Sequence, residues 1–202
     1  MKYLLLALMW LAAPMAQAWH ATVGTYKMLD TTQTSSGSKA SNAFSPMVGV
    51  GGNFSLPWSG WGFSPQLGYV RHTVKSDDSY GGDYQVTTIM MLYDFVWVPQ
   101  TFMAGNNPPF ALRMGIGNFL RSTKGKGGTV TTPNGSSTAT AHRPGDSDTS
   151  YTGTFNLGGD FNFGPLMDWM TNTGLRFETF MFSPLNKEKR TYAFNLLAVA
   201  YF

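Results

Sequence analysis

The sequence contains no cysteine and unusually few charged residues. Of its 202 residues, 12% are Asp, Glu, Lys or Arg, which is about half the share found in a typical soluble domain. The absence of cysteine excludes disulfide frameworks, thiolate zinc sites and thiol catalysis. So little charge disfavours a helix bundle, a nucleotide-binding α/β enzyme and a disordered tail. Aromatic residues, by contrast, reach 15%, and there are 23 glycines.

Long apolar runs are also missing after residue 18. The mean hydropathy is −0.13, and no segment beyond residue 18 offers the 18 or so consecutive apolar residues of a membrane-spanning helix. The first 18 residues differ: Lys2 precedes an apolar core over 4–13, Pro14 ends it, and Ala16-Gln17-Ala18 matches a small-x-small cleavage site. We predict a signal peptide over 1–18, cleaved after Ala18, and one exported domain over 19–202.

The remaining chain repeatedly alternates apolar and polar residues, and turn-forming residues separate the alternating segments. Pro46 and Pro65 fall inside two of these segments, where proline lacks an amide donor, so we expect bulges or shifted boundaries there. We predict eight strands, over 19–29, 43–56, 61–74, 83–98, 109–121, 150–163, 173–183 and 191–202.

The connections between these strands alternate between two kinds. Those over 57–60, 99–108 and 164–172 are short and carry the single charge of Asp168. Those over 30–42, 75–82, 122–149 and 184–190 are polar, and 122–149 is the longest. Short turns on one rim and long loops on the other are typical of an outer-membrane barrel. An even strand number would place both termini on the periplasmic rim.

Individual strands have one apolar and one polar face, as a lipid-facing barrel requires. Over 151–163, one face is aromatic, aliphatic or glycine, and the opposite face carries Asn156, Asp160 and Asn162. The fold class we predict is all-β, an eight-stranded antiparallel up-and-down transmembrane β-barrel. Eight strands enclose an interior that side chains just fill.

These features resemble those of the small eight-stranded outer-membrane proteins of the OmpA/OmpX type. The resemblance is one of architecture, and it rests on the leader, the eight alternating segments and the terminal Tyr201-Phe202. It implies a Gram-negative outer-membrane location, and it implies that Tyr201 and Phe202 form the C-terminal signal read by the barrel-assembly machinery. The small Ala198 and Ala200, which share the face of Phe202, depart from the usual ending of that family.

Charged residues on the predicted inner faces point to a plug. Two arginines and three acids fall at similar heights above the short turns, and the arginine fork suits bidentate pairing with carboxylates where water is scarce. We predict a polar interior plug, and we expect loss of Arg176 to lower thermal stability. The members of this set are Asp94, Arg113, Asp160, Arg176 and Glu178.

Basic residues gather where the strands meet the long loops. Cations at that height would attract the anionic lipopolysaccharide of the outer leaflet. Aromatic residues are expected to form belts at the two interfaces, with Phe182 among those nearer the outer side. The basic residues predicted to face lipopolysaccharide are Arg71, Lys75, Arg121, Lys187 and Arg190.

The function favoured by the sequence is structural or surface interaction through the extracellular loops, without catalysis. The predicted partners are outer-membrane lipid and lipopolysaccharide, the assembly machinery and an extracellular or cell-surface molecule; no nucleic acid, cofactor or metal is predicted. Two alternatives stay open. One is a narrow pore or hydrophobic-solute channel, and the other is a lipid A-modifying acyl enzyme using His72 with nearby Ser and Asp residues. The sequence names neither partner nor solute.

Overall fold

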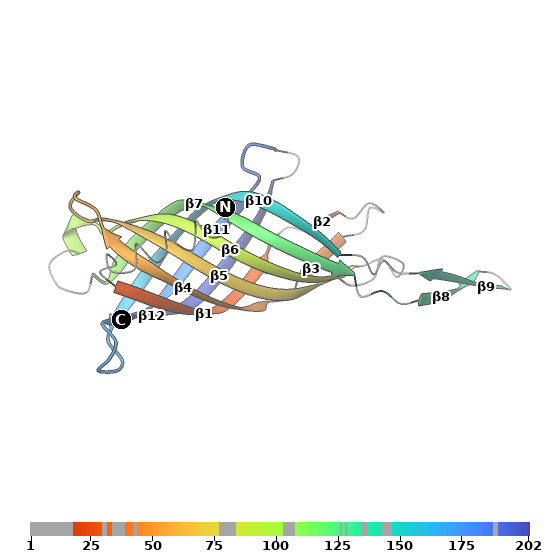
Figure 1. Ribbon diagram of the computed structural model, residues 1–202, viewed down its shortest axis with the longest axis horizontal. Coiled ribbons are helices and arrows are strands. Elements are labelled where there is room, and N and C mark those ends of the chain that lie inside the picture. Colours follow the sequence, from red (N-terminus) through yellow and green to blue (C-terminus); the bar gives the residue numbers. More distant parts are fainter. Residues whose placement is uncertain are drawn as a thin grey trace, which may run out of the picture.

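A computed structural model of the chain describes residues 18–29, 32–33, 39–42, 44–76, 84–102, 108–125, 127, 129–134, 137–142, 147–187 and 190–202. Eight long strands dominate it (Figure 1). They are β1 (Ala18–Met28), β4 (Ser45–Ser55), β5 (Trp61–Ser76), β6 (Tyr84–Trp97), β7 (Phe110–Gly125), β10 (Ser147–Gly164), β11 (Asn172–Phe182) and β12 (Thr191–Tyr201). These bounds lie close to those predicted from the period-2 pattern.

The eight strands form a closed antiparallel barrel. Their order is β5-β4-β1-β12-β11-β10-β7-β6, and pairing of β5 with β6 closes the circle. Each long strand therefore has a hydrogen-bonded neighbour on both sides, which leaves no open sheet edge in the barrel wall. The predicted all-β, eight-stranded fold class is confirmed.

Shorter elements lie at the two ends of the barrel. The C-terminus lies at one end, with the described turns over 56–60 and 165–171; we call this the turn end. At the opposite loop end, β2 (Thr32–Gln33) pairs with β3 (Lys39–Asn42), which in turn pairs with the last residues of β5. There β8 (Thr129–Asn134) and β9 (Ser137–His142) form a projecting hairpin, and a 3₁₀ turn spans Gln100–Phe102 at the turn end. The segment 122–149 was predicted to be a loop, but it contains β8 and β9 and the adjoining ends of β7 and β10.

Neither strand proline produces the bulge expected there, although β4 begins at Ser45 and not at residue 43. Pro46 pairs with Thr25 near the start of β4, in the same register as its neighbours. At Pro65 the β4–β5 ladder has no residue pairs between Gly51–Gln66 and Phe54–Phe63, yet the register is the same on both sides. Proline here interrupts hydrogen bonding without inserting a residue, so the strand continues without a bulge.

The barrel is polar inside at one level and apolar outside. Leu157, Ile116 and Val50 are more than half exposed on the outer wall, whereas Arg113, Arg176 and Glu178 are at most 1% exposed in the interior. Side chains alternate between the two faces of each strand, so charges next to apolar residues in sequence are separated by the wall. Among the described helical residues, none belongs to a segment long and apolar enough to cross a membrane.

Candidate functional site: the barrel interior and its loop end

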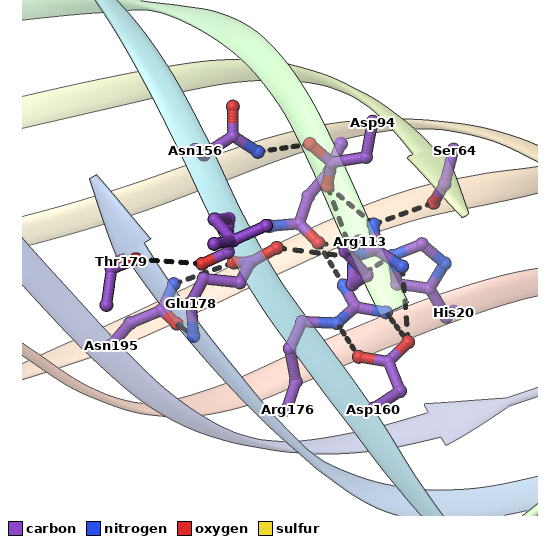
Figure 2. Close-up of polar contacts among 12 residues, drawn as sticks. His20, Ser64, Asp94, Arg113, Asn156, Asp160, Arg176, Glu178, Thr179 and Asn195 are labelled. Atoms are coloured by element: carbon purple, nitrogen blue, oxygen red, sulfur yellow. Dashed lines mark hydrogen bonds and ion pairs between the residues drawn. The ribbon is translucent and has the colours of Figure 1, made fainter. Parts of the chain in front are cut away.

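The five interior charges singled out in the sequence lie together in one layer, which Figure 2 shows. Asp94 comes from β6, Arg113 from β7, Asp160 from β10, and Arg176 and Glu178 from β11. All are almost fully buried. Together with the polar side chains that bind them, we call these residues the ionic layer.

Arg113 binds all three acids of the layer. Its Nη2 donates to Oδ2 of Asp94 at 2.7 Å and its Nε to the same oxygen at 3.2 Å. The same guanidinium lies 3.3 Å from Oε1 of Glu178 and 3.2 Å from Oδ2 of Asp160. A hydrogen bond of 3.0 Å from Nη2 to Ser64 Oγ completes the set. Arg113 on β7 therefore links four other strands from inside.

Arg176 forms a bidentate pair with Asp160. Its Nε donates to Oδ1 at 2.7 Å and its Nη2 to Oδ2 at 3.1 Å, while Tyr201 donates its hydroxyl to Oδ2 at 2.8 Å. The other nitrogen, Nη1, donates to Gln66 Oε1 and lies 3.3 Å from His20 Nε2. Bidentate, charge-assisted pairs of this kind are the stronger class of hydrogen bond.

The remaining carboxylate oxygens have amide donors. Asn195 donates to Oε2 of Glu178 at 2.9 Å, and Asn156 donates to Oδ1 of Asp94. Room for these contacts comes from glycine: a Cβ at Gly115 would lie 2.5 Å from Asp94 Oδ1, and one at Gly158 would lie 2.8 Å from Glu178 Cγ. Each acid of the layer is therefore both ion-paired and hydrogen-bonded, as burial of charge requires.

An apolar layer fills the interior between the ionic layer and the loop end. Phe119 lies at its centre, with ring centroids 5.3 Å from Phe180 and 4.9 Å from Phe182, both in edge-to-face geometry. Such aromatic pairs add about 0.5–1.5 kcal/mol to the burial of the rings. The layer comprises Tyr26, Met47, Val70, Met90, Leu92, Phe119, Phe180, Phe182, Ala193 and Leu197. Phe182, expected in an outer aromatic belt, lies inside because it shares the β11 face of Arg176.

The basic residues predicted to face lipopolysaccharide are found in different environments. Arg71 is exposed on β5 and donates to Gln85 at 2.7 Å, and Lys187 is exposed beyond β11. Arg190 is partly buried and donates to the carbonyl of Pro184 at 2.6 Å. The backbone of Lys75 belongs to β5, and its side chain lies outside the described residues.

Arg121 is not on the outer wall, which corrects its predicted placement. Eight positions separate it from Arg113 along β7, an even number, so both project into the barrel. The Cζ atom of Arg121 lies 4.2 Å from the Phe182 ring and 5.8 Å from the Phe119 ring. It therefore lies against the loop-end side of the apolar layer.

The two C-terminal aromatic residues point in opposite directions. Phe202 is exposed, stacks on Trp169 at 5.6 Å and exchanges backbone hydrogen bonds with Trp19. Tyr201 faces inward and binds Asp160 and Arg176. Sequence reasoning assigned Tyr201 only to the terminal signal and did not connect it with the ionic layer.

His72 lies in the interior and is 5% exposed, with its ring 5.8 Å from that of Tyr26. Its two ring nitrogens have no hydrogen-bond partner in the described part of the chain. Among the acids and serines weighed with it, residues 77–79 and the Ser76 side chain lie outside the described residues. Within the described ranges, no group of three or more His, Asp or Glu could hold a metal ion.

Loss of one arginine from the ionic layer has an expected cost. In Arg176→Ala, Asp160 keeps only Arg113 and Tyr201, and Gln66 and His20 lose their cationic neighbour. Because breaking one buried partner leaves charge uncompensated, we expect a loss of about 3 kcal/mol in unfolding free energy. Urea titration in detergent micelles measures it. A loss no larger than that of the exposed Arg71→Ala would contradict a structural role for the pair.

Fold and interior together define a class: a small eight-stranded barrel with the architecture of outer-membrane proteins. The attachment invasion locus protein Ail of Yersinia pestis, solved in complex with the heparin analogue sucrose octasulfate, has a similar architecture. Ail is 10% identical over 91% of this chain and 97% of its own, with a TM-score of 0.51. This likeness shows the fold.

Two further solved structures align over most of the chain. Neisserial surface protein A is 14% identical, with coverage of 91% and 94% and a TM-score of 0.43. The N-terminal β-barrel domain of Pseudomonas aeruginosa OprF is 10% identical, with coverage of 93% and 98% and a TM-score of 0.37. No family model matches the sequence, and no curated protein matches it.

Proposed function

We propose that this protein is a non-conducting barrel of the Gram-negative outer membrane that acts through its loop end as a surface-interaction protein. The observation that carries the proposal is the filled interior. The ionic layer and the apolar layer lie one above the other, and their side chains are almost all buried. An interior occupied by paired charges and packed rings leaves no continuous aqueous path.

The outer surface supports the membrane location. Exposed apolar side chains line every long strand, and an exposed surface of this kind is stable in hydrocarbon but not in water. Tryptophan and phenylalanine cluster at the turn end, as amphipathic rings do at a membrane interface. They are Trp19, Trp58, Trp61, Phe163, Trp169 and Phe202.

The proposed orientation places the turn end in the periplasm and the loop end outside the cell. It follows from the pattern of outer-membrane barrels, in which short turns are periplasmic and long loops extracellular. In this orientation the exposed Arg71 and Lys187 would lie near lipopolysaccharide, and Phe202 would end the strand offered to the assembly machinery. A leader over 1–18, cleaved after Ala18, would supply export; residues 1–17 lie outside the described residues.

The loop end is the proposed interaction surface, and its partner is an extracellular or cell-surface molecule. Recognition residues concentrate on loops held by a rigid scaffold. The β8–β9 hairpin projects furthest from the barrel (Figure 1), and its six paired residues on each strand give it a defined shape. Deleting residues 129–142 is expected to abolish partner binding on cells while leaving a folded barrel.

Planar-bilayer recording tests the closed interior. The purified protein is expected to show no discrete conductance, with heat-modifiable gel migration confirming that the barrel is folded. Steady openings of uniform size in wild type would contradict the proposal and favour the narrow-pore alternative. Arg113→Ala provides a matched comparison, because transient openings in this variant alone would trace the barrier to the ionic layer.

A further inference from the structure

Arg121 is a third interior arginine, separated from the ionic layer by the apolar layer. The Cζ atom of its guanidinium lies over the ring of Phe182, 4.2 Å from the ring centroid. The side chain retains partial exposure, unlike Arg113 and Arg176 deeper in the barrel. Arg121 is therefore the interior cation nearest the loop end in the described part of the barrel.

The three interior arginines differ in the hydrogen-bond partners of the guanidinium edge formed by Nε and Nη2. Nε and Nη2 lie side by side and can bind two oxygens of one oxyanion. In Arg176 both atoms bind Asp160, and in Arg113 both bind Asp94. In Arg121 both atoms are buried and make no hydrogen bond of normal geometry among the residues that the structure describes; the buried Tyr26 hydroxyl, which also lacks such a bond, interacts with the guanidinium.

Further unpartnered polar groups surround this edge. Thr88 is the direct register partner of Arg121 across the β6–β7 pair, is fully buried, and has no partner for Oγ1 in the described part of the chain. His72 lies on the interior face of β5, two residues beyond the pairing partner of Thr88, and interacts electrostatically with Arg121. Its two ring nitrogens are likewise buried and unpartnered within the described ranges.

Buried donors without acceptors destabilise a fold unless something binds them. Here a guanidinium edge, a hydroxyl and an imidazole lie at nearby register positions on the interior faces of the neighbouring strands β7, β6 and β5. The adjoining rings of Phe119 and Phe182 lower the local polarity and strengthen any ionic contact made there. All three groups can donate hydrogen bonds, so the complementary ligand is an acceptor that carries negative charge.

We propose that the loop end of the barrel interior contains a binding site for the phosphate, sulfate or carboxylate group of a small solute. Two ligand oxygens bind Nε and Nη2 of Arg121, and Thr88 and His72 donate to the same group. The solute enters from the loop end, where Arg121 is partly exposed. This site differs from the extracellular surface proposed above, and it does not depend on that surface's partner.

Isothermal titration of the full protein in detergent micelles tests the site, with inorganic phosphate, sulfate and acetate at matched ionic strength. We expect one saturable site per barrel for at least one of these anions, and none for chloride. Arg121→Gln is expected to weaken binding by at least about tenfold, since two charge-assisted bonds are lost. Arg121→Lys is expected to weaken it as well, because an ammonium group cannot bind two oxygens in parallel.

Lys124→Gln is the matched control. It removes the same charge three residues further along β7, from an exposed position, and is expected to leave affinity unchanged. Thr88→Val preserves side-chain shape and is expected to lower affinity about threefold to tenfold while the anion-free barrel stays folded. Absence of saturable binding to wild type overturns the proposal, as does wild-type affinity in Arg121→Gln. The planar-bilayer recording tests the closed interior separately, so its result does not change how the anion-binding result is interpreted.

Discussion

Replacing Arg113 by alanine is expected to destabilise the folded barrel by about 3–5 kcal/mol, because the change leaves buried acids without a cation. Asp94 and Glu178 make their only ion pairs in the described residues with Arg113, at 2.7 and 3.3 Å. Without it they would face each other as neighbouring carboxylates inside the barrel. Arg176 remains bound to Asp160 and reaches neither of them through a described ion pair.

Equilibrium urea unfolding in micelles, followed by tryptophan fluorescence, measures this loss. Arg71→Ala is the control: this arginine is exposed and binds only Gln85 among the described residues, so its loss is expected to change stability by no more than about 0.5 kcal/mol. In a triple variant, Arg113→Ala with Asp94→Asn and Glu178→Gln, much of the stability is expected to return, because no buried charge is orphaned. A triple variant less stable than the single one would contradict this account.

Phe119→Ala is expected to cost about 3–5 kcal/mol through a cavity in the apolar layer. Phe119 is fully buried and packs edge-to-face against Phe180 and Phe182. In the alanine variant both rings lose a partner, and because the barrel wall that holds them is rigid, they cannot move into the cavity. The same urea titration reports the change.

Phe119→Leu keeps most of the volume and is expected to cost under about 1.5 kcal/mol. The difference between the alanine and leucine variants isolates the cavity from the loss of an aromatic ring. Equal large losses in the two variants would assign the cost to the aromatic ring and not to the cavity. Small losses in both would show that this part of the interior is loosely packed, which would weaken the closed-interior proposal as well.

The strands and the inward charges could be predicted because they depend on local alternation. Charges such as Asp160 and Arg176 stand between apolar neighbours, so a period of two assigns them to the inner face. Which charges meet could not be predicted, since it depends on the stagger between strands. Asp160 stands directly opposite Arg176, whereas Val96, not Asp94, stands opposite Arg113.

The same alternation also places three further residues inside the barrel. Counting in twos from Arg113 reaches Phe119 and Arg121, and counting in twos from Arg176 reaches Phe182. The predictions that assigned Arg121 to lipopolysaccharide and Phe182 to an outer belt relied on closeness to the long loops. They did not use the alternation of side chains between the two strand faces. The apolar layer and the unpartnered guanidinium were both missed for this reason.

Two other features had weak signals or none in the sequence. Asn134-Gly135 is a sequence pair common in hairpin turns, and Asn134 is the last residue of β8, paired with Ser137 of β9. His20 and Ser64 join the ionic layer through hydrogen bonds of 3.3 and 3.0 Å, although neither differs in sequence from an ordinary strand residue. Only three-dimensional proximity identifies them.

Closure of the barrel by β1 and β12 has a kinetic consequence. His20 pairs with Tyr201, so this contact joins strands from nearly opposite ends of the sequence, whereas most other long-strand pairs join neighbours in the chain. Pairs of neighbouring strands close short loops and can form early, but the β1–β12 seam has the highest loop-closure entropy. Closing that seam is therefore the step that commits the chain to a single cooperative unit, and until then both seam strands expose unpaired backbone amides and carbonyls.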